Sequence, residues 1–166
     1  MSRLNTEALR TRHADLEVEV ASSPAASSEI RIGVPAYHAR ELLTRLRDDE
    51  ESAARRLVDL TVIDRSPARS PRFEVVYRLY SSEFQAALRV HARLGSKEGS
   101  DGPAETADSV VSIWPSAGWL EREAFDLFGI DFRGHPDLRR LLLDSDFEGA
   151  PLRKPNAADS AAEGLV

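Results

Sequence analysis

The sequence predicts an α+β fold of two layers, in which helices cover one face of a mixed, mostly antiparallel sheet. Apolar and polar residues alternate over 73–80 and again over 88–94, with a short polar turn between them, as is typical of an antiparallel hairpin with one buried face. Apolar residues recur at helical spacing in 36–47 and 116–128, which indicates helices that pack on this sheet. Six of the eleven aromatic residues lie between Trp114 and Phe147, so we expect the chain to end in an irregular, aromatic-rich extension.

The N-terminal part is divided by composition. Residues 1–20 predict a weak helix with a thin apolar stripe, and the small polar residues ASSPAASS at 21–28 predict a linker. We therefore assign residues 1–28 to an N-terminal segment and linker and start the domain at Glu29. Alternating apolar residues predict a strand over 29–34, and the β-branched run LVDLTVI at 57–63 predicts a buried strand.

The later elements are expected as follows. The glycine-rich stretch 95–108 predicts a loop, and 110–113 a short strand that returns to the sheet. Ser116 is expected to cap the next helix, and Gly129 to end it in a left-handed conformation. Pro136 is expected to open a second short helix that carries Leu138, Leu141 and Leu142. The domain thus spans 29–154, and 155–166 is expected to be a disordered tail.

Composition excludes several classes of function. The chain has 166 residues, which suits one domain, and no cysteine, which excludes thiolate-bound iron–sulfur clusters and thiol catalysis. With 22 Lys and Arg against 28 Asp and Glu, the formal net charge is −6, so no nucleic-acid partner is expected. The sequence has neither a secretory signal nor a stretch of about 20 apolar residues. It therefore predicts a soluble cytoplasmic chain that reaches a membrane only through a partner.

Two interpretations of the charged residues after residue 119 remain open. Glu123 and Asp126 are three apart on the predicted helix and with His135 could form an acid–base cluster, whereas Glu121 lies about 200° around the axis from Glu123. In the alternative, arginines pair with carboxylates and lock the extension onto a partner. The four histidines match no metal-binding spacing, and no glycine-rich phosphate loop is present.

Residues 119–154, WLEREAFDLFGIDFRGHPDLRRLLLDSDFEGAPLRK, resemble the signature of the C subunit family of respiratory complex I, the 30 kDa-type subunit of the proton-translocating NADH:quinone oxidoreductase. The family pattern runs from Glu-Arg-Glu to a His, an Arg and two aliphatic residues. The positions that fill it are Glu121, Arg122, Glu123, Asp126, Leu127, Phe128, His135, Arg139, Leu141 and Leu142. The resemblance covers about residues 29–154.

The resemblance implies a two-layer α+β domain that binds no cofactor and supplies no catalytic residue. NAD, FMN, iron–sulfur clusters and quinone would be bound by other subunits of the complex. The implied partners are the quinone-site subunit and the subunit with the terminal iron–sulfur cluster, in the peripheral arm on the cytoplasmic side of the membrane. The expected interface and signature residues are Trp119, Glu121, Arg122, Glu123, Asp126, Phe128, Gly129, His135, Pro136, Arg139 and Arg140.

Three functions follow from these observations. The first is a cofactor-free structural and assembly subunit of NADH:quinone oxidoreductase, which supports electron transfer and proton translocation without itself being catalytic. The second is the same role in a related membrane-bound hydrogenase or in a dehydrogenase with another electron donor. The third is a stand-alone acid–base enzyme that uses Glu123, Asp126 and His135.

Overall fold

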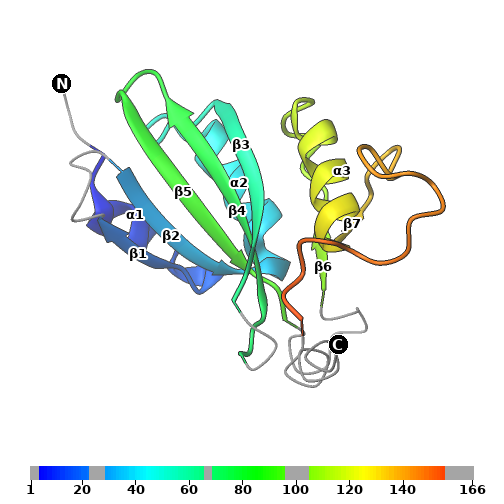
Figure 1. The fold of residues 1–166 in the computed structure, drawn as a ribbon. Coiled ribbons are helices and arrows are strands. Elements are labelled where there is room, and N and C mark those ends of the chain that lie inside the picture. The colour runs from blue at the N-terminus through cyan, green and yellow to red at the C-terminus, as the bar shows by residue number, and fades with distance from the viewer. Residues whose placement is uncertain (1–3, 23–28, 66–68, 96–104, 156–166) are drawn as a thin grey trace.

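A five-stranded mixed sheet forms the body of the protein (Figure 1). The computed structural model describes residues 4–22, 29–65, 69–95 and 105–155. The strand order is β1-β2-β5-β4-β3, in which β2 and β5 are parallel and the other neighbours antiparallel. The strands are β1 (Glu19–Ser22), β2 (Glu29–Pro35), β3 (Arg56–Asp64), β4 (Phe73–Ser81) and β5 (Ala86–Arg93). The predicted α+β class, with a mostly antiparallel sheet, is confirmed.

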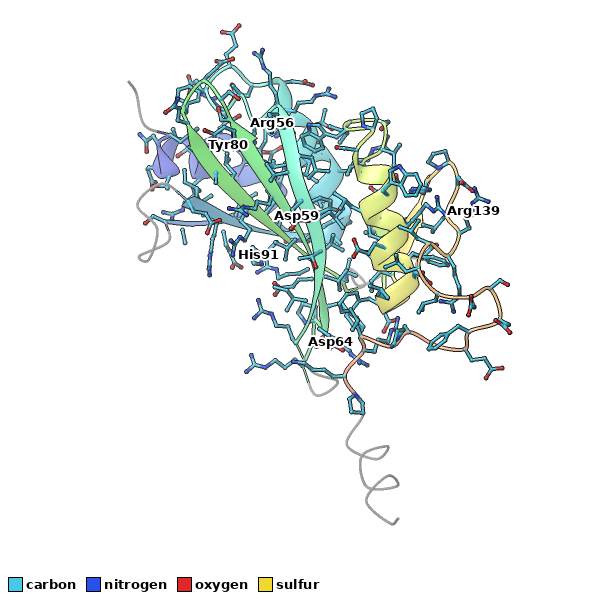
Figure 2. The ribbon with its side chains drawn as sticks, turned by 45° about the horizontal axis from the view of Figure 1, so that its top comes forward. Arg56, Asp59, Asp64, Tyr80, His91 and Arg139 are labelled. Carbon is cyan, nitrogen blue, oxygen red and sulfur yellow. The ribbon has the colours of Figure 1, made fainter. Side chains whose placement is uncertain are left out.

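The two faces of the sheet differ because polar and apolar residues alternate along its central strands. β5 alternates between buried and partly exposed residues along its whole length. In β4, Tyr77 and Leu79 are buried, whereas Arg78 and Tyr80 point to the opposite face with His91 of β5 (Figure 2). The predicted hairpin of β4 and β5 is therefore confirmed, and its polar side forms the open face of the sheet.

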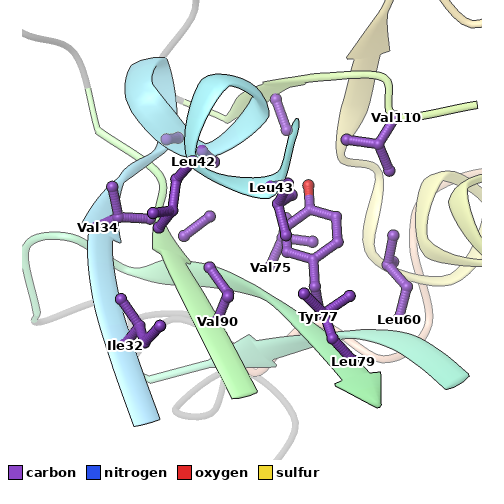
Figure 3. Close-up of a cluster of buried hydrophobic side chains, with 14 of the residues drawn as sticks. Ile32, Val34, Leu42, Leu43, Leu60, Val75, Tyr77, Leu79, Val90 and Val110 are labelled. Atoms are coloured by element: carbon purple, nitrogen blue, oxygen red, sulfur yellow. The ribbon is translucent and has the colours of Figure 1, made fainter. Parts of the chain in front are cut away.

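Helix α2 (Ala36–Asp48) covers the other face of the sheet. Its leucines Leu42, Leu43 and Leu46 have no exposed surface and belong to one core with the inward residues of β2, β4 and β5 (Figure 3). Burying a leucine side chain is worth about 1.5–3 kcal/mol, so this helix contributes strongly to the stability of the domain. The helix predicted over 36–47 is confirmed.

The N-terminal segment contains more structure than the sequence predicted. Helix α1 (Thr6–Arg12) ends well before residue 20, a short 3-10 helix, η1 (Ala14–Leu16), follows it, and β1 pairs antiparallel with β2. Leu9, Leu16 and Val20 are buried in the main core. Residues 6–22 therefore share the core of the predicted domain, while residues 23–28 of the predicted linker lie outside the described residues.

The short strand predicted over 110–113 is wrong. Those residues form a turn, in which the amides of Ile113 and Trp114 both donate to the Val110 carbonyl at 2.9 Å. A strand lies instead within the predicted loop: β6 (Thr106–Asp108) pairs in parallel with β7 (Asp131–Arg133). Residues 96–104 of that loop lie outside the described part of the chain.

Helix α3 (Ala117–Phe128) follows the turn and packs beside β3. Gly129 ends it with φ +65°, as predicted, although the Ser116 side chain makes no capping hydrogen bond. The second helix predicted from Pro136 is wrong, because residues 134–155 contain neither helix nor strand. We call residues 134–154 the strap. None of the described helices is long and apolar enough to span a bilayer, and the tail 156–166 lies outside the described residues.

Candidate docking surface

The strap is fixed to α3 by one fully buried carboxylate, that of Asp126. Oδ2 accepts hydrogen bonds from the amides of Leu141, Leu142 and Leu143 at 3.0, 2.7 and 2.9 Å, and Oδ1 accepts one from Arg140 Nη1 at 2.7 Å. Burial alone would raise the pKa of Asp126, but these four donors outweigh it and hold the pKa well below its ordinary value. In a helix that began at Pro136, these amides would donate to the carbonyls of residues 137–139, so their capture by Asp126 is incompatible with the predicted helix.

Arginine side chains fix the rest of the strap through backbone carbonyls. Arg122 on α3 donates to the carbonyls of Arg139 and Arg140, both at 3.1 Å. Arg140 in turn donates to the carbonyls of Phe147 and Gly149 at 2.8 and 3.2 Å, which closes the loop that it spans. The predicted pairing of arginines with carboxylates is confirmed within the chain for Arg122, Arg133, Arg139, Arg140 and Arg153. Arg122 and Arg140 also bind the backbone of the strap.

The far end of the strap binds to the edge of the main sheet. The Asp64 carboxylate accepts a two-pronged contact from Arg72 and a hydrogen bond from the Lys154 amide at 2.8 Å. The contact with Arg72 lowers the pKa of Asp64, and this effect is larger than the opposing effect of burial. Arg153 donates to the Phe128 carbonyl at 2.5 Å and to Glu105 at 2.7 Å. The strap therefore bridges α3 and the sheet.

Glu121 lies on the opposite side of α3 from the strap and is completely buried. Its Oε1 accepts a hydrogen bond from the Val110 amide at 2.7 Å, and Oε2 has no partner among the described residues. Burial raises the pKa of the Glu121 carboxyl, and the contacts with Val110, Ser109 and His135 offset this only in part. Glu121 thus fixes the turn before α3 and does not itself reach the surface.

His135 links the start of the strap to the start of α3. Its Nε2 lies 3.0 Å from the Gly118 carbonyl, and its Nδ1 lies 3.0 Å from the Asp137 amide. Because the Asp137 amide is a donor, Nδ1 must accept, and the geometry assigns a proton to Nε2. The role of His135 in this structure is to position the strap.

Large apolar side chains of α3 and the strap are exposed. Trp119 is 65% exposed and Leu142 62%, and Phe147 and Leu152 are also exposed. The Arg122 guanidinium lies 5.1 Å from the centre of the Trp119 ring, which orients the indole. Exposed apolar side chains grouped on one part of a protein indicate a protein–protein contact. We call Trp119, Leu142 and Phe147 the apolar anchors.

The predicted interface residues therefore fall into three groups. Trp119, Glu123, Gly129, Pro136 and Arg139 are exposed, whereas Arg122, Phe128, His135 and Arg140 are partly buried and Glu121 and Asp126 fully buried. Leu142 and Phe147 are exposed but do not belong to the predicted set, in which Leu142 was expected to lie on a short helix. The sequence feature that could have indicated their exposure is the acidic, helix-breaking DSD at 144–146, which lies between them.

The structure does not assemble the proposed acid–base cluster. Glu123 is exposed, the oxygens of Asp126 are occupied by four donors, and both ring nitrogens of His135 are engaged. No hydrogen bond joins any two of these three side chains within the described residues. In the same part of the chain, no three His, Asp or Glu side chains gather as metal ligands would.

Two solved structures share the fold. One, described as "Nqo5 of the trypsin-resistant fragment (1-134) in P63 form", matches with a TM-score of 0.60 and 25% identity over 80% of this chain and 98% of that one. The other is a chain of the membrane-bound sulfane sulfur reductase, an archaeal respiratory membrane complex, with a TM-score of 0.67 and 19% identity over 96% of this chain and 89% of that chain. The second likeness shows the fold alone. The architecture is thus one that occurs in a respiratory membrane complex.

Sequence comparison defines the family. Residues 32–161 match the family described as "Respiratory-chain NADH dehydrogenase, 30 Kd subunit", and the chain belongs to it. The NADH-quinone oxidoreductase C subunit of Hyphomonas neptunium is 49% identical over 118 residues, which are 70% of this chain and 54% of that protein. The protein of the same name from Azorhizobium caulinodans is 45% identical over 129 residues, or 78% of this chain and 57% of that protein. The chain therefore spans little more than half the length of these relatives.

Proposed function

We propose that this chain is a structural and assembly subunit in the peripheral arm of a membrane-bound NADH-quinone oxidoreductase. The observation that carries the proposal is the strap, which buried Asp126 fixes to α3, together with the exposed side chains of Trp119 on α3 and Leu142 on the strap. Membership of the 30 kDa subunit family supports the kind of complex in which this surface would be used. The sulfane sulfur reductase is similar in fold only, so we favour NADH-quinone oxidoreductase over a related complex.

The role that we propose is positional and not catalytic. NAD, FMN, iron–sulfur clusters and quinone would be bound by other subunits, and this chain would bind none of them. Electron transfer and quinone chemistry depend on fixed distances, so a rigid scaffold supports turnover without contributing a reacting group. Glu123 is exposed, and Asp126 and His135 are hydrogen-bonded to other groups, which supports this role over that of a stand-alone acid–base enzyme.

The partners that we propose are the quinone-site subunit and the subunit with the terminal iron–sulfur cluster. The apolar anchors would enter pockets on these subunits, with exposed Arg139 at the rim, since aromatic and arginine side chains dominate the centres of protein interfaces. The chain would then be a peripheral membrane protein on the cytoplasmic side, held there by the complex.

The test is co-purification from membranes in mild detergent, with mass spectrometry of the bound chains. We expect the tagged chain to retain the iron–sulfur and quinone-site subunits and W119A/L142A to lose them, because that variant removes two exposed anchors without touching the core. V58A is the matched control, since Val58 is an exposed apolar residue on β3. Isolation of the unaltered chain as a monomer, or equal retention by W119A/L142A and V58A, would refute the proposal.

A further inference from the structure

Three arginines lie side by side on the open face of the sheet. Arg31 of β2 is directly opposite Arg89 of β5, and Arg89 is directly opposite Arg78 of β4. Because side chains alternate along each strand, all three point away from α2. Tyr80 and His91, each two residues further along its strand, lie on the same face (Figure 2). We call Arg31, Arg89 and Arg78 the arginine row.

This arrangement is unfavourable for the isolated fold. Like charges directly opposite one another on neighbouring strands repel, and strands about 4.8 Å apart place the row within about 10 Å. Only Arg89 has an ion-pair partner in the described residues, namely Glu29 at 2.8 Å.

The described positions at the two ends of the row form no ion pair with Arg31 or Arg78. The residue opposite Arg31 on β1 is Ala21. Asp59 lies opposite Arg78 on β3 and partly offsets its charge, although it forms no ion pair with Arg78 and its Oδ1 accepts the amide of Leu60 at 2.9 Å. Neither Arg31 nor Arg78 has a carboxylate within ion-pair distance in the described part of the chain. A fold that keeps an unfavourable local arrangement often does so where it binds something.

We propose that the arginine row binds an acidic segment of another protein chain. Guanidinium groups bind carboxylates through two parallel hydrogen bonds, and the spacing of the row suits successive carboxylates of an extended or helical segment. The chain as a whole carries a net charge of −6, so this local concentration of positive charge is a specific feature of the open face.

The surroundings of the row favour a protein segment over a nucleic acid or a membrane. Glu29 lies beside the row in one direction along the strands and Glu74 lies beyond it in the other, both on the open face. The Glu29 carboxylate is paired with Arg89 and the Glu74 carboxylate with Arg65, so the charge that disfavours a long polyanion or an anionic lipid surface is the net charge of −6 of the whole chain. A short acidic segment needs to contact only the row.

The inference does not depend on the proposed function. The apolar anchors belong to α3 and the strap, which lie beyond β3, whereas the row lies on β2, β5 and β4 (Figure 1). Loss of one surface should therefore leave the other intact.

The experiment compares two doubly substituted full-length chains of equal net charge. R31Q/R78Q removes the two arginines of the row that form no ion pair with a described residue, and R10Q/R133Q removes two exposed arginines from α1 and β7. The probe is a fluorescein-labelled oligoglutamate peptide, and its binding is followed by fluorescence anisotropy at low salt. We expect R31Q/R78Q to bind at least about tenfold more weakly than the unaltered chain, since two charge-assisted contacts are lost. R10Q/R133Q should change the affinity less than about twofold, because it removes no contact with the row.

Urea unfolding supplies the second readout. The midpoint of R31Q/R78Q should equal or exceed that of the unaltered chain, because removing two charges relieves repulsion within the row. A lower midpoint would mean that these arginines stabilise the fold, and would overturn the proposal. The proposal would equally be overturned by the same loss of binding in both variants, by no binding to the unaltered chain, or by tighter binding of duplex DNA or phosphatidylglycerol vesicles than of the peptide.

Discussion

Replacing Asp126 with asparagine should release the strap from α3. Asparagine keeps the shape of the side chain but has one oxygen and one NH₂ group, and the NH₂ group cannot accept a hydrogen bond. If its oxygen faces the amides of Leu141–Leu143, its NH₂ group faces the Arg140 guanidinium. In the other orientation, three backbone donors face the NH₂ group. Either way, buried donors lose their acceptor.

The magnitude follows from the burial of the pair. Removing one partner of a buried ion pair costs about 3–5 kcal/mol. The Arg140 side chain is 27% exposed and can recover part of its hydration, so we take the lower value, about 3 kcal/mol. A change of about 1.4 kcal/mol is tenfold in an equilibrium constant, so the strap should open about a hundredfold more often.

Hydrogen exchange measures this opening at the amides concerned. In the unaltered chain the amides of Leu141, Leu142 and Leu143 exchange only when their hydrogen bonds to Asp126 break. D126N should therefore speed their exchange about a hundredfold. D144N is the control, because it removes the same charge from the exposed part of the strap. Equal exchange rates in D126N and D144N would show that Asp126 does not fix the strap.

Three further predictions concern the ends of α3. The folded-state pKa of Glu121 is raised, so this group stabilises the fold below its unfolded pKa and loses that effect as pH rises through the folded pKa. The urea midpoint of E121Q minus that of the unaltered chain should therefore increase from about pH 4 to pH 8. A constant difference would contradict this. G129A should cost about 1–2 kcal/mol in thermal unfolding, since φ is +65° and a Cβ would lie 3.0 Å from Arg153 Nη2; an unchanged midpoint would refute it. H135A should cost about 1 kcal/mol and speed hydrogen exchange at the Asp137 amide, whereas unchanged exchange would exclude the assigned contact.

The parts of the fold that the sequence predicts well are those with a long periodic pattern. The β4–β5 hairpin alternates over two full strands, and α2 and α3 each keep one apolar stripe for three turns. Gly129 marks the end of α3 because a left-handed residue is needed there. In these elements the local pattern and the tertiary packing agree.

The missed elements are short and depend on contacts far along the chain. β1, β6 and β7 have only three or four residues, so the strand that each pairs with determines whether it forms. The residues at 110–113 have strand-like composition, but the Glu121 carboxylate binds the Val110 amide and supports a turn. Local composition cannot reveal such a partner.

The sequence did not predict how the candidate site residues are arranged. Glu121 lies about 40–60° around the helix axis from Ala117 and Ala124, so its burial could have been inferred from an acid within an apolar stripe. Asp126 lies about 180° around the helix axis from Ala117, on the side that would face solvent if the strap were absent. It is buried only because the strap covers it, and no local pattern predicts that the chain returns there.

The contacts that fix the strap to the body are largely contacts with the strap's backbone. Arg122 binds two of its carbonyls, Asp126 three of its amides, and Asp64 the amide of Lys154. Because the backbone is recognised, the position of the strap does not depend on the Leu142 side chain, and the Phe147 ring is exposed although the Arg140 guanidinium lies 5.9 Å from its centre. A segment without regular secondary structure can in this way be as well positioned as a helix, because its polar groups are satisfied by buried side chains instead of by its own turns. The fold of this chain therefore does not depend on the side chains that we propose bind its partners.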